Sequence, residues 1–203
     1  MKKYLFFLII SIIFPVTSLT VKAQQHDILN KKTALIIIDI QNFYFPGGML
    51  PLYEPEKAAV NAQKALNAFR EQGYIVVHIR HNASSGEEIH KLVAPKKNEK
   101  VISKDKANAF VNTDLLEFLK ENKIENLVLC GMQTHMCLEA ATRAGADYGF
   151  NCIVIEDACT TRDLKFGDVT VNAKDVHYST LSTLKGGYAR IIDTETFLSE
   201  IQH

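Results

Sequence analysis

The chain has 203 residues, of which 47% are hydrophobic and 23% are charged, and its 23 basic residues balance its 23 acidic residues. This length and composition suit one globular domain with a sizeable core. No basic patch is present, so the composition argues against a nucleic-acid-binding protein.

Residues 1–23 are expected to form a cleaved secretory signal. Lys2 and Lys3 precede an apolar run over residues 4–16, and residues 21–23 offer a small-residue cleavage site before Gln24. The apolar run is shorter than the roughly 20 residues that a membrane-spanning helix needs, so an anchor is the weaker interpretation. Cleavage would leave residues 24–203 as a single domain, exported to the periplasm or secreted, with no membrane attachment.

Apolar runs and helical periodicities alternate along the rest of the chain. The pattern predicts strands at residues 34–39, 74–80, 101–103, 127–130, 152–155 and 189–192. It predicts helices at 54–72, after a cap at Asn112 or Thr113, from a cap at Thr134 to Gly149, within 168–184, and from a cap at Thr194. This alternation indicates an α/β protein with a parallel sheet covered by helices on both faces.

Three reactive side chains lie at or just past the ends of predicted strands: Asp39, Lys104 and Cys137. Ligands of such sheets bind beyond the carboxyl ends of the strands, so these side chains could converge there. Cys137 is also expected in the first turn of a helix, where unpaired N–H groups favour a thiolate. Taken singly, each has a structural alternative: a turn carboxylate, a solvated lysine and a buried small hydrophobic residue.

The chain has four cysteines, at positions 130, 137, 152 and 159. An even number in an exported protein can indicate disulfides. Cys130 and Cys152 lie in apolar strand-like runs, however, and we expect no structural bridge. Cys159 follows a predicted strand end and is the main rival of Cys137 as the reactive thiol.

Four short motifs carry a family resemblance. They are Ile-Ile-Asp-Ile-Gln at residues 37–41, Lys-Asp-Lys-Ala-Asn-Ala-Phe at 104–110, Cys-Gly-Met-Gln-Thr-His-Met-Cys at 130–137 and Glu-Asp-Ala-Cys at 156–159. In this order they resemble the isochorismatase-like cysteine hydrolases, over residues 34–198. The resemblance implies a three-layer α/β/α sandwich with a six-stranded, Rossmann-like parallel sheet, and a homo-oligomer, either dimer or tetramer.

The resemblance also implies the roles of the site residues. Asp39, Lys104 and Cys137 match the family's catalytic residues, and a cis peptide is expected between Met132 and Gln133. This peptide would aim the N–H groups of Gln133 and Cys137 at one point as an oxyanion hole. Cys137 would attack an amide carbonyl, with Asp39 as the proton carrier and Lys104 as the nearby positive charge, and water would hydrolyse the resulting thioester.

Departures from the family pattern refine this expectation. Members that hydrolyse nicotinamide carry an Asp-x-His metal motif, whereas residues 78–82 here read His-Ile-Arg-His-Asn, so neither metal nor cofactor is expected. The isochorismate-cleaving members lack the cysteine, which argues against vinyl ether hydrolysis. Candidate pocket residues are Phe43, Phe45, His81 and His135, although His135 could equally serve packing or lie at the surface. The role of His78 stays open.

The leading interpretation is therefore a metal-independent hydrolase of a small carboxamide, ureide or lactam. A thiol redox protein is the first alternative, although the sequence contains no Cys-x-x-Cys motif. A non-catalytic small-molecule-binding module is the second, although binding alone does not require Asp39, Lys104 and Cys137 together. The sequence does not name the substrate, because specificity depends on the loops at 43–53 and 81–100 and on a possible neighbouring subunit.

Overall fold

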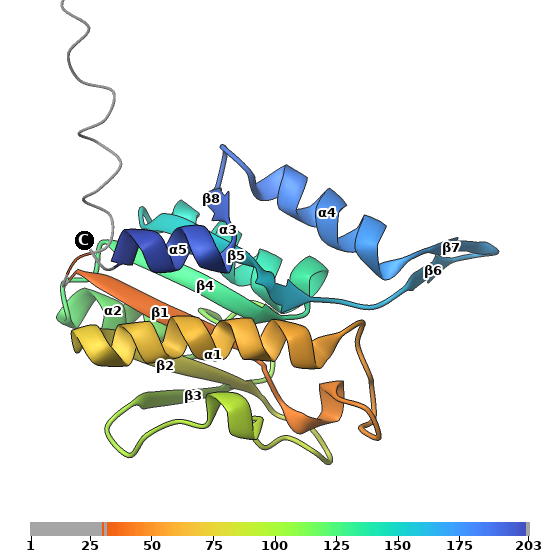
Figure 1. The fold of residues 1–203 in the computed structure, drawn as a ribbon, viewed down its shortest axis with the longest axis horizontal. Coiled ribbons are helices and arrows are strands. Elements are labelled where there is room, and N and C mark those ends of the chain that lie inside the picture. The colour runs from red at the N-terminus through yellow and green to blue at the C-terminus, as the bar shows by residue number, and fades with distance from the viewer. Residues whose placement is uncertain (1–29, 31, 202–203) are drawn as a thin grey trace, which may run out of the picture.

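The computed structural model describes residue 30 and residues 32–201. The expected signal at residues 1–23 lies outside this part of the chain. The core is a six-stranded sheet in the order β3-β2-β1-β4-β5-β8 (Figure 1), and every pair of neighbouring strands is parallel. The predicted α/β fold with a six-stranded parallel sheet is thus confirmed.

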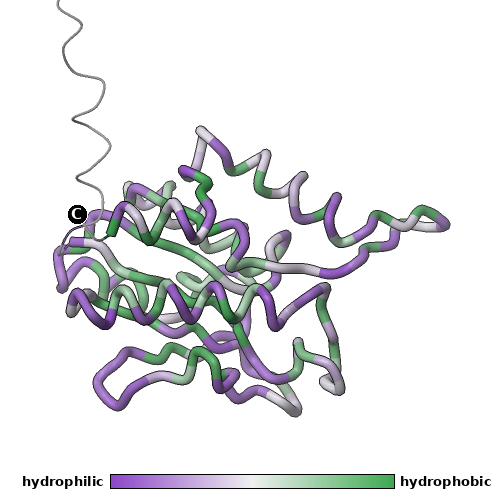
Figure 2. Tube along the Cα trace, in the orientation of Figure 1, coloured by the Kyte–Doolittle hydropathy of each residue, from purple (hydrophilic) through white to green (hydrophobic). Residues whose placement is uncertain are grey.

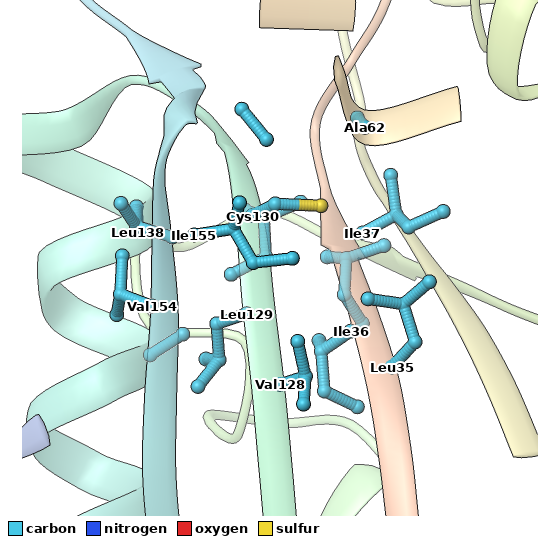
Figure 3. Close-up of a cluster of buried hydrophobic side chains, with 14 of the residues drawn as sticks. Leu35, Ile36, Ile37, Ala62, Val128, Leu129, Cys130, Leu138, Val154 and Ile155 are labelled. Atoms are coloured by element: carbon cyan, nitrogen blue, oxygen red, sulfur yellow. The ribbon is translucent and has the colours of Figure 1, made fainter. Parts of the chain in front are cut away.

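The two central strands are β1, Thr33–Ile38, and β4, Asn126–Met132, and every residue of both is buried. Their runs of aliphatic residues suit this place, because a central parallel strand is covered by helices on both faces. The flanking strands are β2 (Ile75–His81), β3 (Lys100–Lys104), β5 (Asn151–Thr160) and β8 (Ala189–Ile192). Hydrophobic residues follow the strands through the middle of the molecule (Figure 2), and side chains of β1, β4 and β5 pack together there (Figure 3).

Helices cover both faces of the sheet. Helices α1 (Pro55–Gln72) and α5 (Thr194–Ile201) lie in front of it in Figure 1, joined by the stacked rings of Phe69 and Phe197, whose centroids are 5.9 Å apart. Helices α2 (Leu115–Glu121) and α3 (Glu139–Asp147) lie behind it, and α4 (Ala173–Leu184) packs beside α3 and β8. No helix in the described part of the chain is long and apolar enough to span a membrane.

Three helix starts differ from the predicted caps. Helix α2 begins at Leu115, directly after Asp114, and not after a cap at Asn112 or Thr113. Thr134 does not cap a helix: residues Thr134–Leu138 form a single π-helical turn, and α3 begins only at Glu139. The Thr134 hydroxyl lies instead 2.8 Å from Nδ1 of His177. At α5, the carboxylate of Asp193 accepts a hydrogen bond of 2.7 Å from the N–H of Thr196, and the Thr194 hydroxyl donates to Asp157 at 2.6 Å.

Two strand features were not anticipated. β5 continues past Glu156 and Asp157 to Thr160, because its pairing with β4 shifts register between Leu129 and Gly131 and then resumes. In addition, β6 (Leu164–Phe166) and β7 (Val169–Val171) form an antiparallel hairpin that projects from the molecule (Figure 1). The two residues of its turn, Gly-Asp, are a recognised hairpin signal that could have revealed it in the sequence.

Candidate active site

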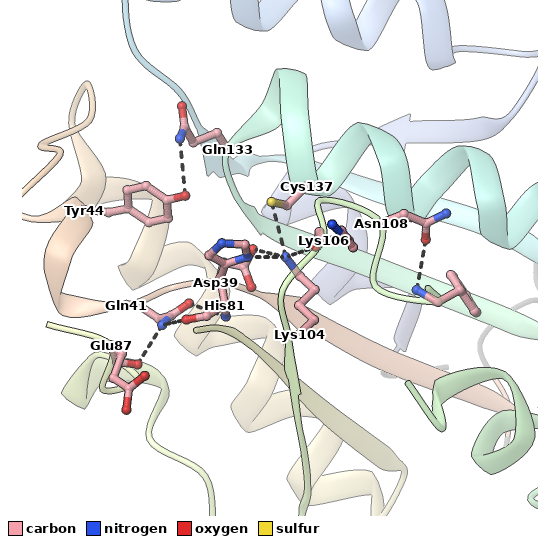
Figure 4. Close-up of polar contacts among 11 residues, drawn as sticks. Asp39, Gln41, Tyr44, His81, Glu87, Lys104, Lys106, Asn108, Gln133 and Cys137 are labelled. Carbon is pink, nitrogen blue, oxygen red and sulfur yellow. Dashed lines mark hydrogen bonds and ion pairs between the residues drawn. The ribbon is translucent and has the colours of Figure 1, made fainter. Parts of the chain in front are cut away.

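The carboxyl ends of β1, β3 and β4 bring three reactive side chains together. Asp39 follows β1, Lys104 is the last residue of β3, and Cys137 lies in the π-helical turn after β4. Nζ of Lys104 donates hydrogen bonds to Oδ2 of Asp39 at 2.8 Å and to Sγ of Cys137 at 3.3 Å (Figure 4). The side chains of Asp39 and Lys104 are fully buried, and Cys137 is 3% exposed. The structure therefore assembles the predicted trio in an enclosed site.

The backbone beside the trio depends on a glycine. Gly131 adopts a φ of +129°, and a Cβ at this position would lie 2.0 Å from the carbonyl oxygen of Ile38. Only glycine therefore lets β4 approach β1 this closely. Asp39 itself has a φ of 50°, an uncommon value for a residue with a side chain. The positive φ values of Asp39 and Gly131 thus change the direction of the backbone just past β1 and within β4, next to the site.

Lys104 is held by more than the two reactive groups. Its ammonium donates to the carbonyl oxygen of Lys106 at 3.0 Å and lies 3.4 Å from Nδ1 of His81. These contacts fix the ammonium between Asp39 and Cys137. They also place the predicted pocket residue His81 directly beside the trio.

Burial shapes the protonation of the two potential anions. It raises the pKa of the Asp39 carboxyl, an effect that the charge of Lys104 opposes. It also raises the pKa of the Cys137 thiol to about 12, and the Asp39 carboxylate adds to this rise while Lys104 opposes it. Lys104 favours the thiolate, as predicted, but burial raises the pKa of the thiol by more, so Cys137 is protonated in the free protein. Asp39 is the neighbouring group that can accept the thiol proton.

The turn before Cys137 carries the expected backbone groups. The peptide bond between Met132 and Gln133 is cis. The carbonyl oxygen of Gln133 accepts hydrogen bonds from the N–H groups of Met136 at 3.0 Å and Leu138 at 3.3 Å. The N–H groups of Gln133 and Cys137, predicted as the oxyanion hole, thus belong to one short turn. Sequence reasoning missed Tyr44, whose hydroxyl accepts a hydrogen bond of 3.2 Å from the Gln133 side chain.

The other predicted pocket residues have different surroundings. His135 lies 2.5 Å from the hydroxyl of Thr161, just past β5. Phe43 is buried against Tyr44, with ring centroids 4.2 Å apart, whereas Phe45 stacks on His90 at 3.8 Å. The ring of Phe45 therefore packs against His90.

Gln41 is a second residue whose role sequence reasoning missed, although it ends the first motif. Its side-chain amide donates to the carbonyl oxygens of His81 at 2.8 Å and Glu87 at 2.7 Å and accepts from the N–H of His81 at 2.8 Å. It thereby fastens the loop after β2 to the end of β1. This contact explains how His81 is kept beside Lys104.

His78 belongs to a separate cluster with Glu99 and Arg70, away from the trio. It is fully buried, and its Nε2 lies 2.9 Å from the carboxylate of Glu99, which also pairs with Arg70 at 2.7 Å. Within residues 30 and 32–201, no group of three or more His, Cys, Asp or Glu side chains could hold a metal ion. The structure therefore gives His78 a packing role that fastens Glu99.

The remaining cysteines lack the hydrogen bond that Cys137 accepts from the ammonium of Lys104. All four cysteines are free and buried. Cys159 lies inside β5, not after its end, and its thiol donates to the carbonyl oxygen of Ile155 at 3.1 Å. Burial raises the pKa values of Cys130 and Cys152 to about 12, as it does that of Cys137, and raises that of Cys159 well above its usual value. Among the four thiols, only that of Cys137 has a lysine ammonium that opposes the rise. The prediction that Cys159 follows a strand end is thus wrong, because β5 continues to Thr160.

The structure also has a cavity of about 280 Å³, which none of Asp39, Lys104 and Cys137 lines. It lies between the start of α1, the end of β5 and the start of α4, and its lining includes Tyr53, Thr161 and His177. His177 contacts Thr134, three residues before the cysteine. Because Asp39, Lys104 and Cys137 are enclosed, a substrate must displace neighbouring side chains to reach them.

Comparison with known proteins gives consistent matches. The family model described as the isochorismatase domain matches residues 33–196. The isochorismatase family protein YddQ of Bacillus subtilis (strain 168), itself uncharacterized, is 45% identical over 177 residues, which cover 82% of this chain and 98% of YddQ. A maleamate amidohydrolase of Pseudomonas putida is 27% identical over 200 residues, covering 85% of this chain and 88% of the relative. The crystal structure of an isochorismatase from Pseudomonas putida KT2440 superimposes with a TM-score of 0.78 at 31% identity, covering 82% of this chain and 90% of that one.

Proposed function

Because this chain belongs to the isochorismatase family of hydrolases, we propose that it cleaves the C–N bond of a small amide-type substrate through a thioester on Cys137. The observation that carries the proposal is the ammonium of Lys104, which hydrogen-bonds both the carboxylate of Asp39 and the sulfur of Cys137. The similarity to a maleamate amidohydrolase supports the choice of an amide-type bond.

The first half of the reaction transfers the acyl group to sulfur. Asp39 takes the thiol proton, and Sγ of Cys137 attacks the substrate carbonyl carbon. The N–H groups of Gln133 and Cys137 receive the negative charge that develops on the carbonyl oxygen. The tetrahedral intermediate then expels the amine, which takes the proton from Asp39, and the thioester remains.

The second half releases the acid. Asp39 takes a proton from a water molecule, and the hydroxide oxygen attacks the thioester carbonyl. The C–S bond breaks, and the sulfur recovers the proton from Asp39. Asp39 suits this shuttle because burial raises its pKa, so that its protonated form is accessible.

Lys104 stabilises the negative charge both before and after the proton moves from Cys137 to Asp39. Before transfer the negative charge lies on Asp39, and after transfer it lies on the sulfur of Cys137. Because one ammonium contacts both atoms, its favourable interaction persists across the transfer. Lys104 does not have to move during the proton transfer, and such a preorganised charge is the condition for effective electrostatic catalysis.

The test combines ammonia release with detection of the thioester. Purified protein is assayed for ammonia against a panel of small carboxamides, ureides and lactams, and rapidly quenched reactions are analysed by peptide mass mapping. We expect an acyl adduct on the peptide containing Cys137, and loss of turnover in Cys137→Ala. Cys159→Ala is the matched control and should keep its activity. Turnover by Cys137→Ala, or an adduct on Cys159, would refute the mechanism.

A further inference from the structure

The hairpin of β6 and β7 has one face made entirely of apolar side chains. Two of its three residue pairs are apolar and share that face: Leu164 with Val171, and Phe166 with Val169. Lys165 and Thr170 form the third pair and lie on the other face, because successive residues of a strand alternate between faces. The hairpin therefore has the amphipathic pattern of a ribbon that packs one face against a protein surface.

The rest of the chain leaves this apolar face uncovered. The hairpin projects from the molecule (Figure 1), and Phe166 is 88% exposed, Val169 61% and Val171 38%. An isolated two-stranded hairpin is at best marginally stable in water, and a cluster of exposed apolar side chains marks an interaction surface. Phe166 gains most from a partner, because its aromatic ring is both large and the most exposed of the three side chains.

The cavity of about 280 Å³ lies at the root of the same hairpin, where the hairpin joins β5 and α4. Thr161, shortly before the hairpin, and Ala173, shortly after it, both line the cavity. Its lining also includes Ala58, Tyr53 and Tyr178. Small apolar residues and aromatic residues form a suitable lining for a phenyl ring.

Two copies of the chain can satisfy both surfaces at once. The cavity lies at the root of the hairpin, and Phe166 lies beside the turn at its tip, so a strand of three residues, about 10 Å long, separates them. When two hairpins lie side by side in opposite directions, the tip of each meets the root of the other. Such a contact is self-complementary, as an interface with twofold symmetry requires.

The charges at the tip and at the cavity complement each other. Asp168 lies in the turn next to the apolar face, and Lys174 lines the cavity with its ammonium 5.6 Å from the centre of the Tyr53 ring. Within residues 30 and 32–201, neither of the two forms an ion pair. In the twofold arrangement, the carboxylate of one copy lies near the ammonium of the other. This complementarity favours a second copy of the chain as the partner.

We propose that the apolar face of the hairpin docks on a second copy of the chain, with Phe166 of each copy inserted into the cavity of the other. Asp168 of one copy then lies beside Lys174 of its partner. The dimer contact goes beyond the proposed amide hydrolysis and does not depend on it, because neither the hairpin nor the cavity includes Asp39, Lys104 or Cys137.

Sedimentation velocity over a dilution series of the purified protein measures the dissociation constant of the dimer. Phe166→Ser should raise this constant at least about 100-fold, because two rings leave the interface and each contributes at least about tenfold. Tyr148→Ser is the matched control: Tyr148 is 52% exposed but lies before the other end of β5, so the constant should stay unchanged. A monomeric natural protein, or equal constants for the two variants, would overturn the proposal.

A charge exchange tests the same contact without removing an apolar side chain. Asp168→Lys alone and Lys174→Asp alone should each weaken the dimer, because like charges then meet at both ends of the interface. When the two variants are mixed, they should form a mixed dimer as stable as that of the natural protein, because every contact again joins opposite charges. Both positions are exposed, so the variants should fold normally. Failure of the mixture to recover the dimer would show that Asp168 and Lys174 of different copies do not meet, and would refute the arrangement.

Discussion

The ammonium of Lys104 lies between two groups that can each carry a negative charge, and it can neutralise only one of them. In the buried site the carboxylate of Asp39 is closer, at 2.8 Å against 3.3 Å for the sulfur of Cys137. Burial raises the pKa of the Cys137 thiol and the Asp39 carboxylate adds to this rise, so the thiol keeps its proton until Asp39 accepts it. The sequence predicts which three residues meet, because each follows a strand of one parallel sheet. It does not predict the protonation state, which depends on how completely the folded chain excludes water from the site.

Removing the charge of Lys104 should destabilise the fold as well as abolish the proposed activity. Lys104→Met leaves Asp39 as an unpaired buried carboxylate, and we expect the free energy of unfolding to fall by about 3–5 kcal/mol. The double variant Asp39→Asn with Lys104→Met should recover part of this loss, because no buried charge remains. Lys106→Met, at an exposed position, is the control and should change stability by less than about 0.5 kcal/mol. Denaturant unfolding measures all three, and equal stability of Lys104→Met and the control would contradict the account.

Elements that rest on a strong periodic pattern were predicted correctly, and those set by local contacts were not. Residues 54–72 combine a proline in the first turn, regularly spaced alanines and a terminal glycine, and α1 ends at Gly73 with a φ of 67°. The π-helical turn at Thr134–Leu138 has no such signal. It arises because the N–H of Leu138 reaches the carbonyl oxygen of Gln133, five residues back, instead of the usual four.

The junction of β1 and β4 should tolerate no side chain at Gly131. In Gly131→Ala the new Cβ would meet the carbonyl oxygen of Ile38 at 2.0 Å, and the clash is with backbone that cannot move away. We expect a loss of more than about 4 kcal/mol in the free energy of unfolding, or an insoluble protein.

Gly149→Ala is the matched control for Gly131→Ala. Gly149 also has a positive φ, of 91°, but nothing lies within 4 Å of the position that a Cβ would take there. Its substitution should therefore cost only the backbone strain, about 1–3 kcal/mol. Equal unfolding free energies for the two variants would show that the close approach of the strands does not depend on glycine.

Across the whole molecule, the site was more predictable than its surroundings. Asp39 and Lys104 lie at strand ends and Cys137 lies in the turn that follows β4, so the parallel sheet brings the three to one edge. Tyr44 lies in a connecting segment whose path depends on packing between distant parts of the chain, such as the hydrogen bond from the N–H of Tyr53 to the carbonyl oxygen of Thr161 at 2.8 Å. Periodicity contains no information on such contacts, so the path of this segment could not be predicted from the sequence.

Export of the protein is expected from the sequence alone. Lys2, Lys3, the apolar run at residues 4–16 and the site at residues 21–23 form the pattern of a secretory signal. The strands and helices of the described chain begin at Thr33, so cleavage before Gln24 removes none of them. We expect the mature protein to begin near Gln24, to be recovered from the exported fraction, and to retain the activity of the complete domain. Intact-mass measurement on protein from its natural compartment decides this, and a full-length chain in the cytoplasmic fraction would show that residues 1–23 are not a cleaved signal.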